Sequence, residues 1–290
     1  MAEAWADQAD GLRRMLSGVP LQVVSLTSAH GDAGRPWAVL NLAAALRLAG
    51  VGVLVIDAAA GHPGGLTSQR RSGHELADVL AGGCALEAAI LPGPEGIPVL
   101  PARTGVADLA GSSAAARRLV SCLQALPGGI EVLLVNLPSG ETGDQVSPAL
   151  LDHELVLSVA PNSDSITSTY RLIKRLALSS GKREFRLLVT GVTSVREAQR
   201  VHRNLSDALA RWAGVQLVML GVMPADQHLR HAASQGRALV ASEPAAAAAS
   251  SFRRMADSLI LWRSRGLGGP DRSSFFRADA AGLASHPMRG

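Results

Sequence analysis

The 290-residue sequence predicts an α/β fold with a doubly wound, mostly parallel sheet and helices on both of its faces. Three observations carry this prediction. Short runs of Val, Leu and Ile recur along the chain, and they are continuous rather than alternating, as in parallel strands that are buried on both faces. Stretches of helical period follow most of these runs. The composition, 47% hydrophobic and 18% charged, supplies enough apolar surface for one large domain.

The order of these segments along the chain gives the expected elements. Seven apolar runs are expected to form strands: Leu21–Leu26, Val51–Ile56, Ile97–Leu100, Val132–Leu137, Leu155–Ala160, Phe185–Val189 and Val215–Leu220. Apolar residues recur with a helical period in six further stretches: Trp37–Ala49, Ala114–Leu126, Ser165–Ser179, Val195–Trp212, Asp226–Ser234 and Ser250–Arg265. Alternation of strands and helices with short connections favours parallel pairing throughout the sheet.

The ends of the chain differ in composition from this central domain, which is expected to span residues 19–265. Residues 1–18 are polar and are expected to form a helical extension. Residues 266–290 are rich in Gly, Pro, Ser and Arg, a composition that predicts a disordered tail.

Composition also excludes several classes of function. The net charge of +4 comes from basic residues that are scattered or gathered near the end of the chain, without the interleaved aromatic residues of a groove for single-stranded nucleic acid, and no specific nucleic-acid partner is expected. Cys84 and Cys122 lack the spacing of a disulfide framework or a zinc site. No apolar run approaches the ~20 residues that span a bilayer, and the N-terminus has no apolar signal region. We therefore expect a cytoplasmic protein.

A glycine loop joins the first apolar run to the first helix and is the most informative motif. Residues 29–36 read Ala-His-Gly-Asp-Ala-Gly-Arg-Pro, laid out as a phosphate-binding loop of the form G-x-x-x-x-G-K-[ST]. In such a loop the lysine reaches the β- and γ-phosphates and the hydroxyl holds Mg²⁺. Gly31 and Gly34 are in place, but Arg35 and Pro36 stand where lysine and threonine belong.

The loop and two later segments resemble the deviant-Walker ATPases of the MinD/ParA class. The helix after the loop contains Asn41-Leu42-Ala43, the second strand ends at Asp57, and a later strand ends in the run from Asn136 to Gly140. The last two segments resemble the switch segments of that class. The resemblance covers nearly the whole chain, and it implies a P-loop NTPase fold with ATP and Mg²⁺ as ligands and a homodimer that sandwiches the nucleotide.

The first residues narrow the resemblance to one branch. The run Asp7-Gln8-Ala9-Asp10-Gly11-Leu12-Arg13 resembles the D-Q-A-x-x-L-R motif of the flagellar-number regulators, the FlhG/FleN family. The resemblance implies that this segment stimulates a partner GTPase of the FlhF type. Gln8 would then reach toward the partner's nucleotide, with Asp7, Leu12 and Arg13 as anchors. It further implies regulatory contacts with a flagellar transcriptional activator or with switch proteins.

Departures from the family predict a degenerate nucleotide site. The matching positions are His30, Gly31, Asp32, Ala33, Gly34, Arg35, Pro36, Asp57 and Asn136. The resemblance aligns His30 with the signature lysine, Arg35 with the Walker lysine and Pro36 with the Mg²⁺-binding threonine. Asn136 replaces the Walker B aspartate, and Ala59 replaces the aspartate that orients water. Because phosphoryl transfer depends on positioning and charge neutralisation, we expect no robust ATP hydrolysis and little nucleotide binding.

Three alternatives stay open at this stage. The amphipathic helix at 250–265 presents Phe252, Met255 and Leu259 on one face, which fits either a peripheral contact with the membrane or packing onto the sheet. The chain could instead be an active ATPase that cycles between a cytoplasmic monomer and a membrane-bound dimer. A third reading is a ParA-like factor that positions DNA or cargo, with nonspecific and salt-dependent DNA binding.

Overall fold

The structure is a computed structural model that describes residues 21–31, 34–59, 66, 73–106, 113–126, 129–144, 146, 150 and 153–264. The expected partner-activating segment 1–18, with Asp7, Gln8, Leu12 and Arg13, lies outside the described residues. The expected tail 266–290 lies outside them as well. Those two expectations stay predictions.

An eight-stranded sheet runs through the described part of the chain, in the order β3-β4-β2-β5-β1-β6-β7-β8. The strands are β1 (Gln22–Ser28), β2 (Val53–Asp57), β3 (Leu91–Pro92), β4 (Pro98–Pro101), β5 (Val132–Asn136), β6 (Glu154–Val159), β7 (Glu184–Val192) and β8 (Gln216–Pro224). The two-residue β3 is antiparallel to β4, and every other neighbouring pair is parallel. The mostly parallel sheet predicted from the continuous apolar runs is confirmed.

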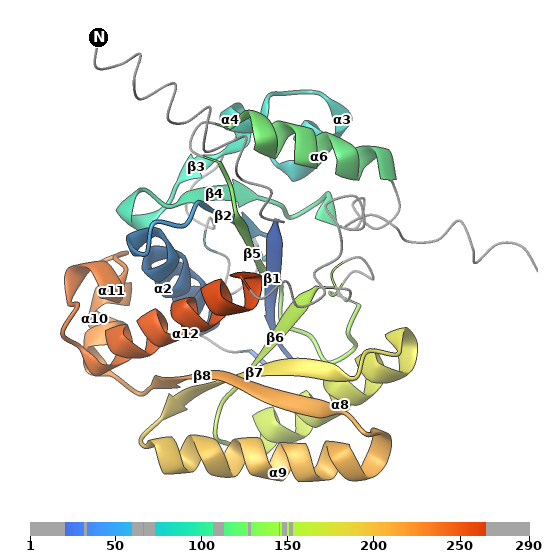
Figure 1. The fold of residues 1–290 in the computed structure, drawn as a ribbon, viewed down its shortest axis with the longest axis vertical. Coiled ribbons are helices and arrows are strands. Elements are labelled where there is room, and N and C mark those ends of the chain that lie inside the picture. The colour runs from blue at the N-terminus through green and yellow to red at the C-terminus, as the bar shows by residue number, and fades with distance from the viewer. Residues whose placement is uncertain are drawn as a thin grey trace, which may run out of the picture.

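Helices cover both faces of this sheet (Figure 1). One face carries α2 (Arg35–Leu48), α10 (Gln227–Ser234), α11 (Leu239–Ser242) and α12 (Ala247–Ser264). The other carries α3 (Leu76–Ala81), α4 (Leu86–Ala89), α6 (Ser113–Ala125), α8 (Ser163–Ser180) and α9 (Val195–Ala213). A short 3₁₀ turn, η1 (Pro94–Gly96), precedes β4. The doubly wound architecture is therefore confirmed as well.

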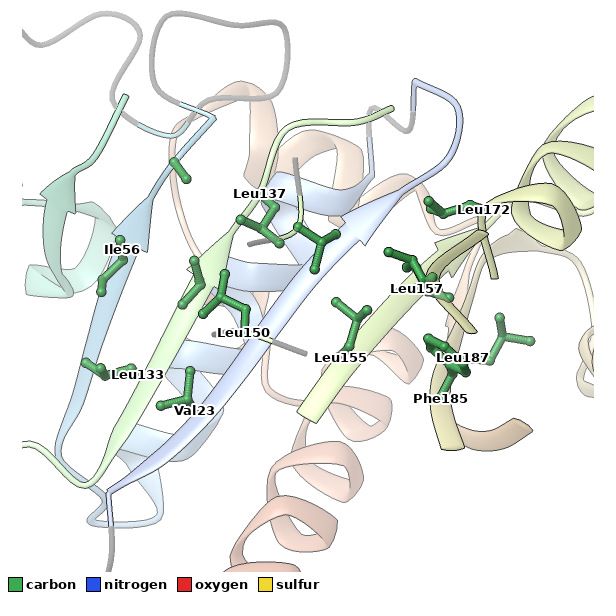
Figure 2. Close-up of a cluster of buried hydrophobic side chains, with 14 of the residues drawn as sticks. Val23, Ile56, Leu133, Leu137, Leu150, Leu155, Leu157, Leu172, Phe185 and Leu187 are labelled. Carbon is green, nitrogen blue, oxygen red and sulfur yellow. The ribbon is translucent and has the colours of Figure 1, made fainter. Parts of the chain in front are cut away.

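Two apolar cores lie on opposite faces of the central strands. Successive residues of a strand point to opposite faces, so Val23 joins the core under α8 and α9 while Val24 joins the core under α2 and α12. Leu133 and Leu134 of β5 divide in the same way. Figure 2 shows side chains of the first core meeting between neighbouring strands, including Val23, Leu133 and Leu155. Burial on both faces explains why these strands read as unbroken apolar runs.

The C-terminal helix α12 lies on α2 and β8 (Figure 1). Phe252 and Leu259 are fully buried there and Met255 is nearly so. The last turn is held by stacking of the Arg186 guanidinium on the Trp262 ring, 4.4 Å from its centroid, and by an ion pair between Arg263 and Glu131. Of the two arrangements open from the sequence, packing onto the sheet is the one found here. The same apolar stripe could meet a membrane only after α12 leaves the sheet.

Candidate nucleotide-type site

The carboxyl ends of three central strands bring the predicted site residues together. β5 lies between β1 and β2, and the register sets Asn136 beside Leu26 on one side and beside Asp57 on the other. Ser28 ends β1 two residues beyond Leu26. In open α/β sheets, ligands bind outside the carboxyl ends of the strands. Polar residues end these apolar strands at the place where the fold builds a site.

Helix α2 begins directly at the glycine loop. Gly34 is the N-cap residue, with φ −80° and ψ −25°, and no side chain caps the helix. Pro36 falls in the first turn, where the absence of an N–H costs nothing because the first helical N–H groups have no intrahelical partner. Arg35 is the first helical residue, and its side chain is fully buried. Arg35 and Pro36, which replace the lysine and threonine of the motif, are therefore compatible with the first turn of α2.

The Arg35 guanidinium lies at the centre of the site and donates hydrogen bonds to three side chains. Its Nη1 donates to Ser139 Oγ at 2.6 Å and to Ser28 Oγ at 3.1 Å. Its Nε donates to Asn136 Oδ1 at 3.2 Å. Ser28 and Ser139 also bond to each other, with their hydroxyl oxygens 2.7 Å apart. A cation inside the protein is thus paired with polar groups from two strand ends and the segment after β5.

Asn136 connects this hydrogen-bond network to the end of β2. Its Nδ2 donates to Asp57 Oδ1 at 2.8 Å, and Asp57 Oδ2 accepts from the Leu66 backbone N–H at 2.7 Å. Arg35, Asn136 and Asp57 are all fully buried. One amide therefore joins a buried cation to a buried carboxylate, using its oxygen for the first and its nitrogen for the second. The amide assignment follows from this pattern of bonds.

Sequence reasoning placed Arg35, Pro36, Asp57 and Asn136 in the site and missed the two serines. Ser28 directly precedes the loop and Ser139 lies within the run from Asn136 to Gly140, but a hydroxyl carries no sequence signal until its partner is known. Ala59, which replaces the expected water-orienting carboxylate, is fully buried, and its N–H donates to the Asn136 carbonyl at 3.0 Å. A backbone hydrogen bond of Ala59 thus holds the segment after β2, at a position where the family pattern has an aspartate.

The remaining loop positions lie apart from this network. His30 and Gly31 are exposed, and Asp32 and Ala33 fall outside the described residues. A Cβ at Gly31 would meet nothing within 4 Å, and the backbone of Gly34 is in the region that any residue adopts. The backbone at neither position is one that only glycine adopts.

The residues present do not fit a Mg²⁺–nucleotide complex. Arg35 points a wide planar guanidinium into the site, where a loop of this type has a slim ammonium. Pro36 has no hydroxyl for the metal, and the Asn136 amide carries no charge to hold it. Both polar ends of Asn136 are already engaged by Arg35 and Asp57. The poor fit to Mg²⁺ and nucleotide therefore involves Asn136 at the end of β5 as well as Arg35 and Pro36 at the loop.

Comparison with known proteins places the fold. No family model matches the chain. The MinD cell division protein of Aquifex aeolicus superposes with a TM-score of 0.61 at 22% identity, over 82% of this chain and 97% of that one. A ParA family ATPase of Chlorobium tepidum superposes with a TM-score of 0.58 at 16% identity, over 83% of this chain and 100% of that one. The fold is that of the MinD/ParA class.

A curated relative identifies the branch. The antiactivator FleN of Pseudomonas aeruginosa is 30% identical over 257 residues, which are 87% of this chain and 90% of that protein. The chain belongs to the FlhG/FleN family. The similarity predicted from the loop, the switch segments and the Asp7-to-Arg13 motif is confirmed at the level of the family. No helix among the described residues is long and apolar enough to cross a membrane.

Proposed function

We propose that this protein regulates flagellar number and flagellar biosynthesis through protein contacts, with a nucleotide site that neither hydrolyses nor requires ATP. Two observations support the proposal. The similar protein of Pseudomonas aeruginosa is named an antiactivator, which is the name of a regulatory role. In this chain a buried arginine bonded to Ser28, Ser139 and Asn136 lies where phosphate chemistry would take place.

The proposed partners follow from the family resemblance of the first residues. Asp7, Leu12 and Arg13 would anchor the N-terminal segment on an FlhF-type GTPase, and Gln8 would reach its nucleotide. A transcriptional activator of flagellar genes is the second proposed partner, in keeping with the antiactivator description of the relative. Neither contact needs the central site to bind ATP. The proposal therefore separates partner binding from nucleotide turnover.

The proposal is tested by measuring GTP hydrolysis of an FlhF-type partner with the full chain added. We expect stimulation of the same size with and without Mg-ATP, and we expect Gln8→Ala to return the rate to that of the partner alone. Gln199→Ala, on the exposed face of α9, is the matched control and should stimulate like the natural chain.

Three outcomes contradict the proposal in different ways. Stimulation that rises severalfold on addition of Mg-ATP would favour the alternative of an active ATPase cycle. Equal stimulation by the Gln8→Ala chain would remove the motif assignment. Steeply salt-dependent binding of the chain to DNA would instead favour the ParA-like alternative.

A further inference from the structure

The position of Arg35 raises a question that loss of catalysis alone does not answer. An arginine left over in an abandoned loop could simply extend into water, because a guanidinium is costly to bury without partners. Arg35 is instead fully buried and is among the largest fully buried side chains of the described residues. Its polar partners come from the end of β1, the end of β5 and the segment that follows β5.

These bonds link segments that are far apart in the sequence. Arg35 starts α2, and it reaches Ser28 seven residues before it and Ser139 104 residues after it. Through Asn136 the series continues to Asp57, and from Asp57 to the backbone of Leu66. The loop–helix junction and both switch segments are thereby joined in one hydrogen-bonded series. The Gly140 N–H, which donates to the Ser28 carbonyl at 3.0 Å, closes the same region through the backbone.

We propose that the Arg35 guanidinium is a built-in replacement for a nucleotide, which holds the two switch segments in a single arrangement without any ligand. The inference deepens the proposed function and rests on it for the statement that no nucleotide is needed. An arginine suits this role because its donors are fixed in one plane and point in different directions. A lysine concentrates its donors on one rotating ammonium, so it would be a poorer bridge between Asn136 and the two serines.

Backbone hydrogen exchange on the full chain, without nucleotide, tests the proposal. The reporters are the amides of Leu66 and Gly140, and the amides of β5 serve as an internal reference for global opening. We expect Arg35→Gln to raise exchange at both reporters at least tenfold while the β5 amides stay within twofold. Arg47→Gln, on the exposed part of the same helix, is the matched control and should leave both reporters unchanged.

A second variant keeps the test decisive if Arg35→Gln does not fold. Ser139→Ala removes one guanidinium partner and leaves the arginine in place, so we expect Gly140 to exchange at least threefold faster with β5 unchanged. Changes below twofold at the reporters in every folded variant would overturn the proposal. Reporters in the natural chain that become protected only with Mg-ATP would overturn it too. Failure of the GTPase test alongside the expected exchange pattern would remove the proposed partner but leave the replacement by Arg35 intact.

Discussion

Burial has different effects on the charge of two basic side chains, Arg35 and His153. Arg35 stays charged, because a guanidinium cannot be deprotonated in proteins, and its burial is tolerated through hydrogen bonds to three side chains. His153 is also largely buried, and burial together with the positive charge of Lys182 lowers the pKa of its imidazole to about 4. Histidine can lose its proton and arginine cannot. Buried His153 is therefore neutral at neutral pH, and buried Arg35 is charged and hydrogen-bonded.

His153 makes the stability of the fold dependent on pH. Between pH 6.5 and about 4 the unfolded chain binds a proton at this residue and the folded chain does not. We therefore expect the free energy of unfolding to fall by roughly 3 kcal/mol as the pH drops through this window, with no contribution above it. Urea titrations of the natural chain and of His153→Gln would show this slope only in the former. His231→Gln, an exposed control, should keep it.

Single residues also show how far sequence could predict the site. Asp57 and Asn136 each end an apolar run, and parallel strands end at the same edge, so their meeting was predictable. That Arg35 would turn inward was not predictable, because arginine is usually exposed and Asn136 is joined as its partner by two serines, Ser28 and Ser139, whose hydroxyls carry no sequence signal. The sequence predicted which groups were lost from the site. It did not predict what took their place.

At the scale of elements, length decided which helices and strands were predictable. Among the described residues, every strand of four or more residues and every helix of eight or more is expected from its apolar pattern, with boundaries that differ by a few residues. In the same described residues the elements that are not expected are β3, α3, α4, α11 and η1, which have two to six residues. Such elements are too short to show a period, and the neighbouring packing fixes them. Helix α12 had a clear period, yet the same stripe suited a membrane and a sheet equally.

The contact between α12 and β8 gives a prediction at this scale. A Cβ added at Gly221 would lie 2.4 Å from both Cγ and Sδ of Met255, which is too close for the side chain to stay in place. We expect Gly221→Ala to lower the free energy of unfolding by about 1–3 kcal/mol. In the Met255→Ala background the same change should cost less than about 0.5 kcal/mol, because the clash is gone.

Urea denaturation of the two single variants and the double variant measures this coupling. Gly73→Ala is the control, since a Cβ there meets nothing within 4 Å. Equal costs of Gly221→Ala in both backgrounds would mean that α12 does not approach β8 as closely as described.

At the scale of the whole molecule, the fold and the central site differ in how much sequence change they tolerate. Members of the MinD/ParA class share this sheet at low sequence identity, so the architecture survives extensive change. The central site is less tolerant, because its chemistry depends on a few charged groups. The resemblance implies a homodimer that closes on nucleotide, and under the proposed function we expect the chain not to assemble in that way, because the charged groups that would hold the nucleotide are replaced.

Sedimentation velocity is the measurement suited to this scale. We expect the sedimentation coefficient of the natural chain to be the same with and without Mg-ATP, whatever its oligomeric state. A chain carrying His30→Lys, Arg35→Lys, Pro36→Thr, Ala59→Asp and Asn136→Asp restores the charged groups and the metal-binding hydroxyl of the family pattern. In this variant we expect the sedimentation coefficient to change when Mg-ATP is added. A shift in the natural chain would contradict the degenerate site.

The hydrogen bonds of Arg35 to Ser28, Ser139 and Asn136 have a consequence for the cell. A nucleotide reports on energy supply, because its occupancy of a site follows the balance of ATP and ADP. A side chain is present at a fixed ratio of one per molecule and cannot be depleted. A regulator built in this way would not respond to the balance of ATP and ADP, and its effect would follow its own concentration instead.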